Sequence, residues 1–182
     1  QEQPTQQQET LLPYDMVPLP SQGIFYPNNK KSVKVSYLNA SDENLLASQV
    51  SKEGNLVNAL ISRKMLDKDI IVEDMADCDK EAILVFLRNT AFGPEYQVKL
   101  TDPKTNEEFD ATVDLSVLKT RDMEVELDEN MEFDFFLEQS KKKVKLSFLS
   151  PEDEKYLKGV DEQYKDQPVS PFMTKQLEKM VK

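Results

Sequence analysis

The feature that most constrains this chain is a change in its hydrophobic period. From Gly54 to Gly93 the apolar residues recur every three or four positions, which is typical of one face of an amphipathic helix. From residue 95 to residue 149 they mostly alternate with polar residues, as in half-buried strands. Helical patterns return after residue 150. Strand and helix runs that are segregated in this way favour an α+β fold over a doubly wound α/β sheet.

Five segments have helical patterns, at residues 41–48, 55–66, 79–93, 150–164 and 172–182. The serines that begin the first and fourth segments are typical N-cap residues, and Pro151 fits the first position of the fourth. Either Asp77 or Asp79 can cap the third segment, which Gly93 and Pro94 end.

Six segments alternate with period two and are expected to be strands, at residues 31–38, 95–101, 108–115, 123–127, 132–138 and 142–149. The turn-forming sequence DPKTNE separates the second and third, which predicts a hairpin. A second hairpin is expected between the last two segments, with their aromatic and aliphatic residues on one shared face.

The chain divides by composition into three parts. Residues 1–15 are rich in Gln, Glu and Pro and cannot bury enough apolar surface, so a disordered Gln-rich tail is expected. Residues 16–149 are expected to form a single α+β domain, and residues 150–182 a C-terminal helical extension. The methionine-containing face of the last helix can pack on its own domain or dock into a groove of another chain.

The segment MVPLPSQGIFYP, residues 16–27, opens the expected domain and reads as neither helix nor strand. Its prolines favour an extended path, and Gly23 permits a turn with positive φ. We expect an ordered element whose aromatic residues press on the core or on a partner. We also expect it to lie near the corner formed by Gly93 and Pro94.

Composition excludes several classes of function. The net charge is −11, so nucleic acid and membrane surfaces are not expected partners, and no apolar run approaches a membrane span. Histidine is absent and Cys78 is the one cysteine, which excludes a Ser-His-Asp triad, histidine zinc sites and an intrachain disulfide. No enzymatic activity and no cofactor are therefore expected. A carboxylate pair such as Asp110 and Asp114 is the remaining catalytic alternative.

An acidic stretch, Asp122–Glu138, contains eight acidic residues and, within it, no basic one. It can be a cation site or a dock for a basic partner, or it can be the solvated face of a strand pair. Its acids alternate with apolar residues, which favours the solvated face. The lysine-rich sequence KKKVK at 141–145 is then expected to neutralise these acids across the strands, in preference to binding phosphate.

Two segments, taken together, resemble one known family. LPSQGIFYP at 19–27, followed by an alternating strand and an acid-started SDENLL helix, resembles the opening of T4-type phage baseplate hub proteins. These proteins carry a Leu-Pro-Ser-x-Gly-x-x-Tyr-Pro element. LRNTAFGPEYQVKLTDPKTNEEFDATVDLSVL at 87–118 is similar to that family's arginine-containing helix end, aromatic-Gly-Pro-x-Tyr corner, hairpin and acidic exit. The resemblance covers roughly Met16 to Leu149.

The hairpin tip departs from the family pattern. Relatives often have a Cys-x-x-Cys pair there, which suggests a zinc knuckle. Here the tip is TDPKTNEE at 101–108, with no cysteine and no histidine. Metal binding at the tip is therefore not expected, and turn-forming residues must hold the hairpin instead.

The resemblance implies a structural or assembly protein of a contractile-tail baseplate, in the hub region of the virion, assembled in the host cytoplasm. It would act by contacts with other baseplate or hub proteins, within a multi-subunit assembly. An assembly chaperone absent from the mature particle, and an acidic module that docks a basic partner outside a virion, stay open as alternatives. The residues expected to contact partners lie in the N-terminal element, the corner and the last helix: Leu19, Pro20, Gly23, Phe25, Tyr26, Pro27, Arg88, Phe92, Gly93, Tyr96, Phe172, Met173, Leu177 and Met180.

Overall fold

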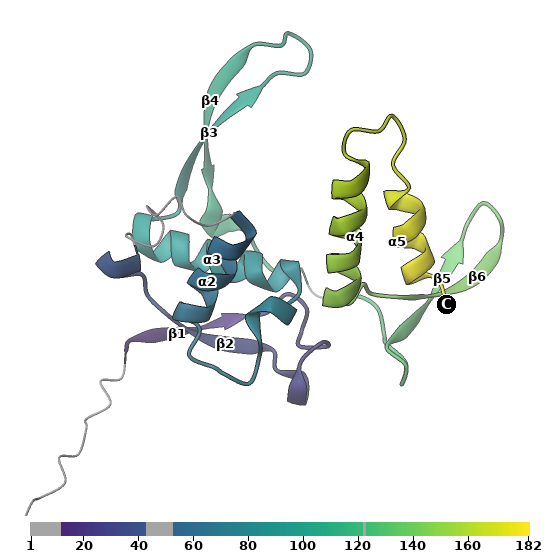
Figure 1. The fold of residues 1–182 in the computed structure, drawn as a ribbon, viewed down its shortest axis with the longest axis horizontal. Coiled ribbons are helices and arrows are strands. Elements are labelled where there is room, and N and C mark those ends of the chain that lie inside the picture. The colour runs from purple at the N-terminus through teal and green to yellow at the C-terminus, as the bar shows by residue number, and fades with distance from the viewer. Residues whose placement is uncertain (1–11, 43–52, 122) are drawn as a thin grey trace, which may run out of the picture.

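The structure, a computed structural model, describes residues 12–42, 53–121 and 123–182. Its strands are β1 (Tyr14–Pro18), β2 (Ser32–Ser36), β3 (Glu95–Thr101), β4 (Glu108–Asp114), β5 (Glu132–Leu137) and β6 (Lys142–Ser147). Its helices are α2 (Glu53–Lys64), α3 (Asp77–Phe92), α4 (Pro151–Tyr164) and α5 (Phe172–Met180), with short 3-10 turns η1 (Pro27–Asn29), η2 (Val72–Asp74) and η3 (Leu115–Val117). The expected α+β class is confirmed (Figure 1).

The described strands form three separate two-stranded antiparallel sheets, β1–β2, β3–β4 and β5–β6. Both hairpins expected from the sequence are therefore confirmed. The helix expected at 41–48 lies outside the described residues from residue 43 onward. Within the described part of the chain, every helix is too short or too polar to cross a membrane.

The first two strands and the helices α2 and α3 form an N-terminal lobe (Figure 1). β1 and β2 pair with Val17 opposite Val33, and the helices pack against this ribbon. The buried apolar side chains of the lobe make one core: Val17, Leu19, Tyr26, Val33, Val35, Leu60, Ile61, Met65, Ile70, Val72, Met75, Ile83 and Leu87. Burial of this core is the main stabilising contribution to the lobe.

The start of the ordered chain differs from the expectation. β1 begins at Tyr14, inside the segment expected to be a disordered tail, and it includes Met16 to Pro18, which were expected to be neither helix nor strand. The strand forms because Val17 is buried against the core and pairs with β2. Pro18 is tolerated because β1 is an edge strand of a two-stranded sheet, where a missing backbone N–H can face away from the partner strand.

After β1 the chain makes what we call the N-terminal turn, residues 19–27. This turn packs against the first turn of α3, through hydrogen bonds to Asp79. The expectation that it lies near the Gly93 corner is wrong. Gly93 follows the other end of α3, and at about 1.5 Å per residue the helix separates the two places by roughly 20 Å.

The N-terminus of α3 is capped by other elements. The sequence suggested Asp77 or Asp79 as its N-cap. This is wrong, because the N-cap position falls on Ala76. The first N–H groups of a helix lack partners within it. Here the Ala76 N–H donates to the Tyr26 hydroxyl at 3.0 Å, and the Asp77 N–H donates to the Glu154 carboxylate at 2.9 Å. Glu154 belongs to α4, so this cap joins distant parts of the chain.

The last two strands and helices form a C-terminal lobe (Figure 1). Ser150 caps α4 in a capping box with Asp153, and Pro151 is the first helical residue, as expected. Val181, which follows α5, forms a bridge with Leu146 in β6. The hairpin β5–β6 thus packs with the helices that follow residue 149, while the domain boundaries given above stay a prediction.

The strand expected at residues 123–127 is wrong, because these residues have no strand conformation in the structure. A strand needs a neighbour to satisfy its backbone, and β5 pairs with β6. Met123 and Val125 instead line a hollow between the two lobes. The alternation of apolar and acidic residues in this segment therefore belongs to an irregular stretch of chain, whose apolar side chains are half-buried and whose acids are exposed.

Candidate partner-binding surfaces

The N-terminal turn is held in place by one buried carboxylate, Asp79. Its two oxygens accept the Ser21 N–H at 2.9 Å and the Tyr26 O–H at 2.5 Å. Burial, and then the hydrogen bond to Asp79, raises the pKa of Tyr26 far above its ordinary value, so the phenol stays protonated and remains a donor. The turn is therefore locked to the N-terminal end of α3.

Three residues of this turn that were expected to contact partners serve the fold of the lobe. Leu19 has an exposed fraction of 0% and Tyr26 of 7%. Gly23 has φ of +78°, and a Cβ there would lie 2.6 Å from the backbone of Asn29 and Lys30. Both the positive φ and the close backbone approach require a glycine at this position. Pro27 begins η1 and is exposed, so it alone among these four is available at the surface.

The predicted corner lies where α3 passes into β3. Gly93 ends the helix with φ of +81°, and Arg88 donates to the carbonyls of Gly93 and Glu95. The guanidinium of Arg88 also lies over the ring of Tyr96, 5.2 Å from its centroid. Arg88 therefore fixes the direction in which the hairpin leaves the lobe, while Phe92 keeps an exposed fraction of 66%.

The β3–β4 hairpin projects from the N-terminal lobe (Figure 1) and has one apolar face. In its register Tyr96 lies opposite Val113 and Leu100 opposite Phe109. Because opposite residues of an antiparallel pair share a face, six apolar side chains gather on one side. We call this set the apolar hairpin face: Tyr96, Val98, Leu100, Phe109, Ala111 and Val113.

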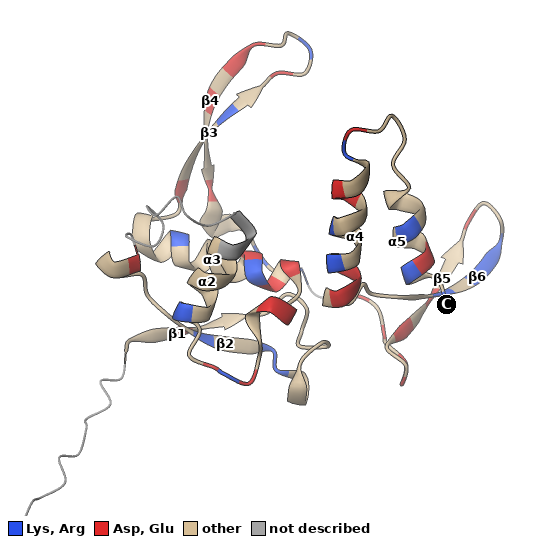
Figure 2. Ribbon diagram, in the orientation of Figure 1, with Lys and Arg blue, Asp and Glu red and all other residues tan. Residues whose placement is uncertain are grey.

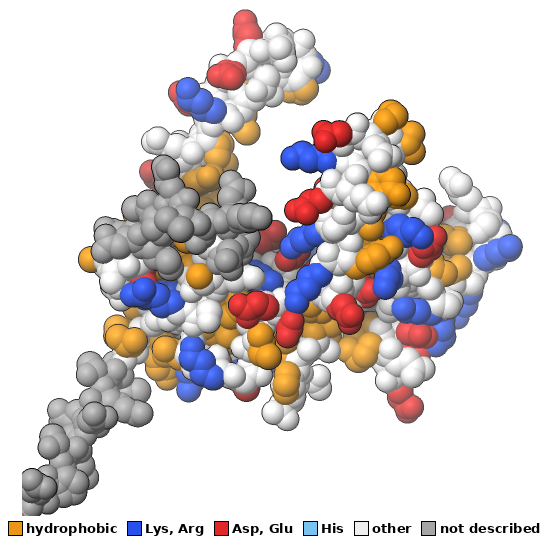
Figure 3. All heavy atoms as spheres, viewed as in Figure 1, with side chains coloured by type: hydrophobic (Ala, Val, Ile, Leu, Met, Phe, Trp, Pro, Cys, Tyr) orange, Lys and Arg blue, Asp and Glu red, His pale blue; other side chains and the backbone are white. Residues whose placement is uncertain are grey.

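The apolar hairpin face is open to solvent. The exposed fractions of its large side chains are 46% for Tyr96, 44% for Leu100, 49% for Phe109 and 40% for Val113. Hydrophobic side chains are visible along the projecting hairpin in Figure 3. The sequence prediction named only Tyr96 from this face. The alternation that reveals the others was present in both strands, but it was used only to predict the hairpin.

The hairpin tip is closed by turn chemistry, as its lack of cysteine and histidine requires. The side chain of Asp102 accepts the Lys104 N–H at 2.7 Å, and Asn106 adopts a left-handed conformation with φ of +60°. The Asp102 N–H also donates to the Glu107 carbonyl at 2.9 Å. None of the residues that a zinc knuckle uses is present, so the tip does not fit that metal site.

The C-terminal helix α5 turns part of its apolar stripe outward. Met173 and Leu177 have exposed fractions of 65% and 55%, whereas Phe172 and Met180 are half-buried. Val181, just after the helix, bridges to β6, so the helix packs on its own lobe through one side. The sequence left open whether this helix packs on its own domain or docks into another chain. Both are compatible with the structure, because one side of the helix is packed and the other is uncovered.

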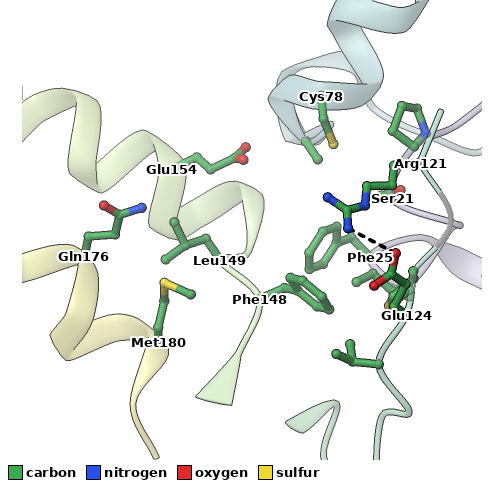
Figure 4. Close-up of a pocket in the computed structure, with 15 residues that line it drawn as sticks. Ser21, Phe25, Cys78, Arg121, Glu124, Phe148, Leu149, Glu154, Gln176 and Met180 are labelled. Atoms are coloured by element: carbon green, nitrogen blue, oxygen red, sulfur yellow. Dashed lines mark hydrogen bonds and ion pairs between the residues drawn. The ribbon is translucent and has the colours of Figure 1, made fainter. Parts of the chain in front are cut away.

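A hollow of about 580 Å³ lies between the N-terminal turn and the C-terminal lobe. Figure 4 shows Phe25 and Ser21 on one side of it and Leu149, Gln176 and Met180 on the other. Three predicted residues, Pro20, Phe25 and Met180, come together here from distant parts of the sequence. An exposed ion pair, Lys155–Asp74 at 2.7 Å, also connects the two lobes.

Cys78 also lines this hollow. Partial desolvation, and then the carboxylate charges of Asp79 and Glu154, raises the pKa of the thiol to about 12. A thiol of this pKa is protonated at neutral pH, and the thiolate is the reactive form. The side chain is therefore poorly suited to act as a nucleophile.

The acidic stretch and the lysines after it meet in the β5–β6 hairpin. Lys145 lies 2.5 Å from Asp128 and 3.6 Å from Glu132, and Lys143 lies 3.0 Å from Asp134. The pairs of Lys145 with Glu132 and of Lys143 with Asp134 are cross-strand pairs of the kind expected from the sequence, while Asp128 lies just before β5. In the described part of the chain, no three Asp, Glu or Cys residues are grouped so as to hold a metal ion. The solvated-face interpretation is supported.

Comparison with known proteins gives one family. A profile of the T4 bacteriophage base plate protein family matches residues 23–180. The match extends over both C-terminal helices, beyond the segments that carry the resemblance described above. No curated protein and no solved structure matches the chain.

The chain therefore belongs to the T4 bacteriophage base plate protein family. This membership makes it a phage baseplate protein, part of the multi-subunit tail assembly of the virion.

Proposed function

We propose that the chain is a non-enzymatic structural or assembly protein of the baseplate hub, which works by binding other baseplate proteins. The observation that carries this proposal is the uncovered apolar hairpin face, which projects from a lobe that has its own buried core. Contiguous apolar surface of this kind marks binding sites in soluble proteins. The hub placement is supported by the two segments that resemble hub proteins, LPSQGIFYP and residues 87–118.

A role without catalysis is supported by the residues available for chemistry. The chain contains no histidine, and the raised pKa of Cys78 keeps its thiol protonated. Asp110 and Asp114, the carboxylate pair considered above, lie on the polar side of a projecting hairpin, and both side chains are exposed to solvent. General acid and base groups work in sites that shape the substrate and tune their pKa.

The placement of the chain within the tail is tested by deletion and by mass spectrometry. We expect a phage that lacks this protein to accumulate incomplete baseplates. We also expect the protein in purified virions, since we propose that it is assembled into hubs in the host cytoplasm. If it is present in assembly intermediates but absent from virions, it is a chaperone. Normal tails from the deletion phage would contradict both forms of the proposal.

A further inference from the structure

The two faces of the β3–β4 hairpin differ completely in chemistry. The apolar hairpin face holds six apolar side chains, and the residues between them are all polar or charged. The polar side comprises Glu95, Gln97, Lys99, Thr101, Glu108, Asp110, Thr112 and Asp114. Two-sided segregation of this kind is typical of a sheet that has one covered face and one solvated face. In this chain the apolar face is left open.

The described parts of the chain supply no cover for this face. β3 and β4 pack extensively on each other, and the other described helices and strands make at most marginal contact with either. Figure 1 shows the hairpin standing away from both lobes. The base is fixed by the Leu115 N–H, which donates to the Pro94 carbonyl at 2.9 Å, and by Arg88. The hairpin is therefore presented outward on a fixed support.

The charge of the hairpin indicates what can cover it. Residues 95–114 contain six acidic and two basic side chains, which is a net charge of −4 (Figure 2). The strand acids are separated from a partner on the apolar hairpin face by one strand layer, a distance comparable with the Debye length of roughly 8 Å at physiological salt. A partner surface with lysine or arginine at its border is favoured, and an acidic one is repelled.

A second copy of the chain fits this face poorly. Two hairpins stacked face to face would bring together two segments of net charge −4.

We propose that the apolar hairpin face docks on another baseplate protein, at an apolar surface strip bordered by lysine or arginine. The proposal rests on the proposed function, because it names the surface through which the chain would join the hub. Leu100 and Phe109, which lie opposite each other far from the base, would insert at the centre of the contact. The acids of the polar side would speed association and set its salt dependence.

A photo-crosslinking experiment tests the proposal on the full chain. A benzophenone side chain is placed at Phe109 on the apolar hairpin face, or at Asp110 on the polar side as the matched control. Each variant is supplied to infected cells that lack the natural copy, and crosslinked products in tail assemblies are sequenced. We expect the Phe109 probe to give at least tenfold more product than the Asp110 probe. The crosslinked peptide should belong to a different tail protein and carry a positive net charge.

A pair of double variants gives an independent readout. Leu100→Ser with Phe109→Ser changes two facing apolar residues, and Lys99→Ser with Asp110→Ser changes the facing pair one position away. We expect the first to lower incorporation into tail assemblies about tenfold or more and the second to lower it less than threefold. Both should melt cooperatively, because the hairpin lies outside the core of the lobe.

The outcomes separate this proposal from the proposed function. If the protein enters tail assemblies but the two probes crosslink equally, or crosslink to a second copy or to an acidic peptide, the docking proposal is wrong while the hub role stands. If incorporation is unaffected by the Leu100 and Phe109 changes, the docking proposal is also wrong. If the protein never enters an assembly and its loss leaves tails normal, the proposed function itself fails.

Discussion

The N-terminal turn and the β3–β4 hairpin contain the same kinds of apolar residue, but these side chains are buried in the turn and exposed in the hairpin. Leu19 and Tyr26 of the turn have exposed fractions of 0% and 7%, whereas Leu100 and Tyr96 of the hairpin have 44% and 46%. The turn lies against α3 and donates two hydrogen bonds to the buried carboxylate of Asp79. The hairpin extends past the end of α3, where the described chain provides nothing to pack on. Apolar side chains thus stabilise the fold in one region and are left for binding in the other.

The largest loss of stability that we expect in either region comes from a change at Gly23 in the N-terminal turn. A side chain added there meets the backbone of Asn29 and Lys30 at 2.6 Å, in a conformation that residues other than glycine rarely adopt. We expect Gly23→Val to cost more than about 4 kcal/mol of stability, enough to unfold the lobe. Gln22→Ala should cost under about 1 kcal/mol, because Gln22 is only half-buried. Urea unfolding measures both, and similar small losses would show that the turn is a simple tether.

The next test compares one leucine from each region. Leu19→Ala leaves a cavity in the core, and we expect a loss of about 2–5 kcal/mol. Leu100→Ala removes a side chain that already contacts water, and the loss should stay under about 1 kcal/mol. Thermal and chemical unfolding of the isolated chain give both values. Equal losses would mean that the apolar hairpin face is packed in solution.

A third test compares one tyrosine hydroxyl from each region. Tyr26→Phe removes the donor to Asp79 and the acceptor for the Ala76 N–H, both buried. We expect a loss of about 1–3 kcal/mol. Tyr96→Phe keeps the ring under Arg88 and should change stability by less than about 0.5 kcal/mol. If Tyr26→Phe leaves the free energy of unfolding unchanged, the hydrogen bonds of the Tyr26 hydroxyl do not stabilise the turn.

The smallest effect that we expect is on the loss of folding stability at low pH. Burial acts to raise the pKa of Asp42, but the ammonium of Lys64, the Asn39 N–H and Arg63 outweigh it and hold the pKa below its ordinary value of 3.8. The unfolded chain therefore takes up the proton first, so this stabilisation is complete above about pH 5 and is lost as the pH falls through the folded pKa.

We expect the loss of stability between pH 6 and pH 3 to be smaller in Asp42→Asn than in the natural chain, as measured by urea unfolding at each pH. The control is Asp114→Asn at the end of the hairpin, where hydrogen bonds from Ser116 lower the pKa of an exposed carboxyl. That change should alter the acid response less than Asp42→Asn does, because the Asp114 carboxyl is exposed and its interactions are screened by water. An unchanged response in Asp42→Asn would place the acid-sensitive pair elsewhere.

Much of the fold follows from the sequence because its signals are local. The N-cap at Ser150, the end of α3 at Gly93 and the two hairpins were all predicted from spacing and turn residues. What the sequence did not predict depends on contacts between distant segments. Asp79 reads as a helix cap, yet the N-terminal turn 53 residues away takes its carboxylate. Glu154 supplies the cap instead, from 77 residues away.

The candidate surfaces show the same limit. A strand that alternates apolar and polar residues has the same pattern whether its apolar side meets a core or faces solvent. The sequence therefore indicated the face that holds Leu100 and Phe109 but not that it would be uncovered. Conversely, the Leu-Pro-Ser-x-Gly-x-x-Tyr-Pro element was expected to press on the core or on a partner, and the sequence could not decide between the two. In the structure Leu19, Gly23 and Tyr26 hold the N-terminal turn on α3.

The central claim is that the apolar hairpin face is open in the free protein and covered in the baseplate. Thiol labelling tests it most directly, with Val113→Cys on the apolar hairpin face and Thr112→Cys on the polar side, each in a Cys78→Ser background. We expect both thiols to react readily in the free chain. In tail assemblies the thiol at 113 should react at least tenfold more slowly while the thiol at 112 changes little. Equal reactivity at 113 in the free and assembled states would contradict the account.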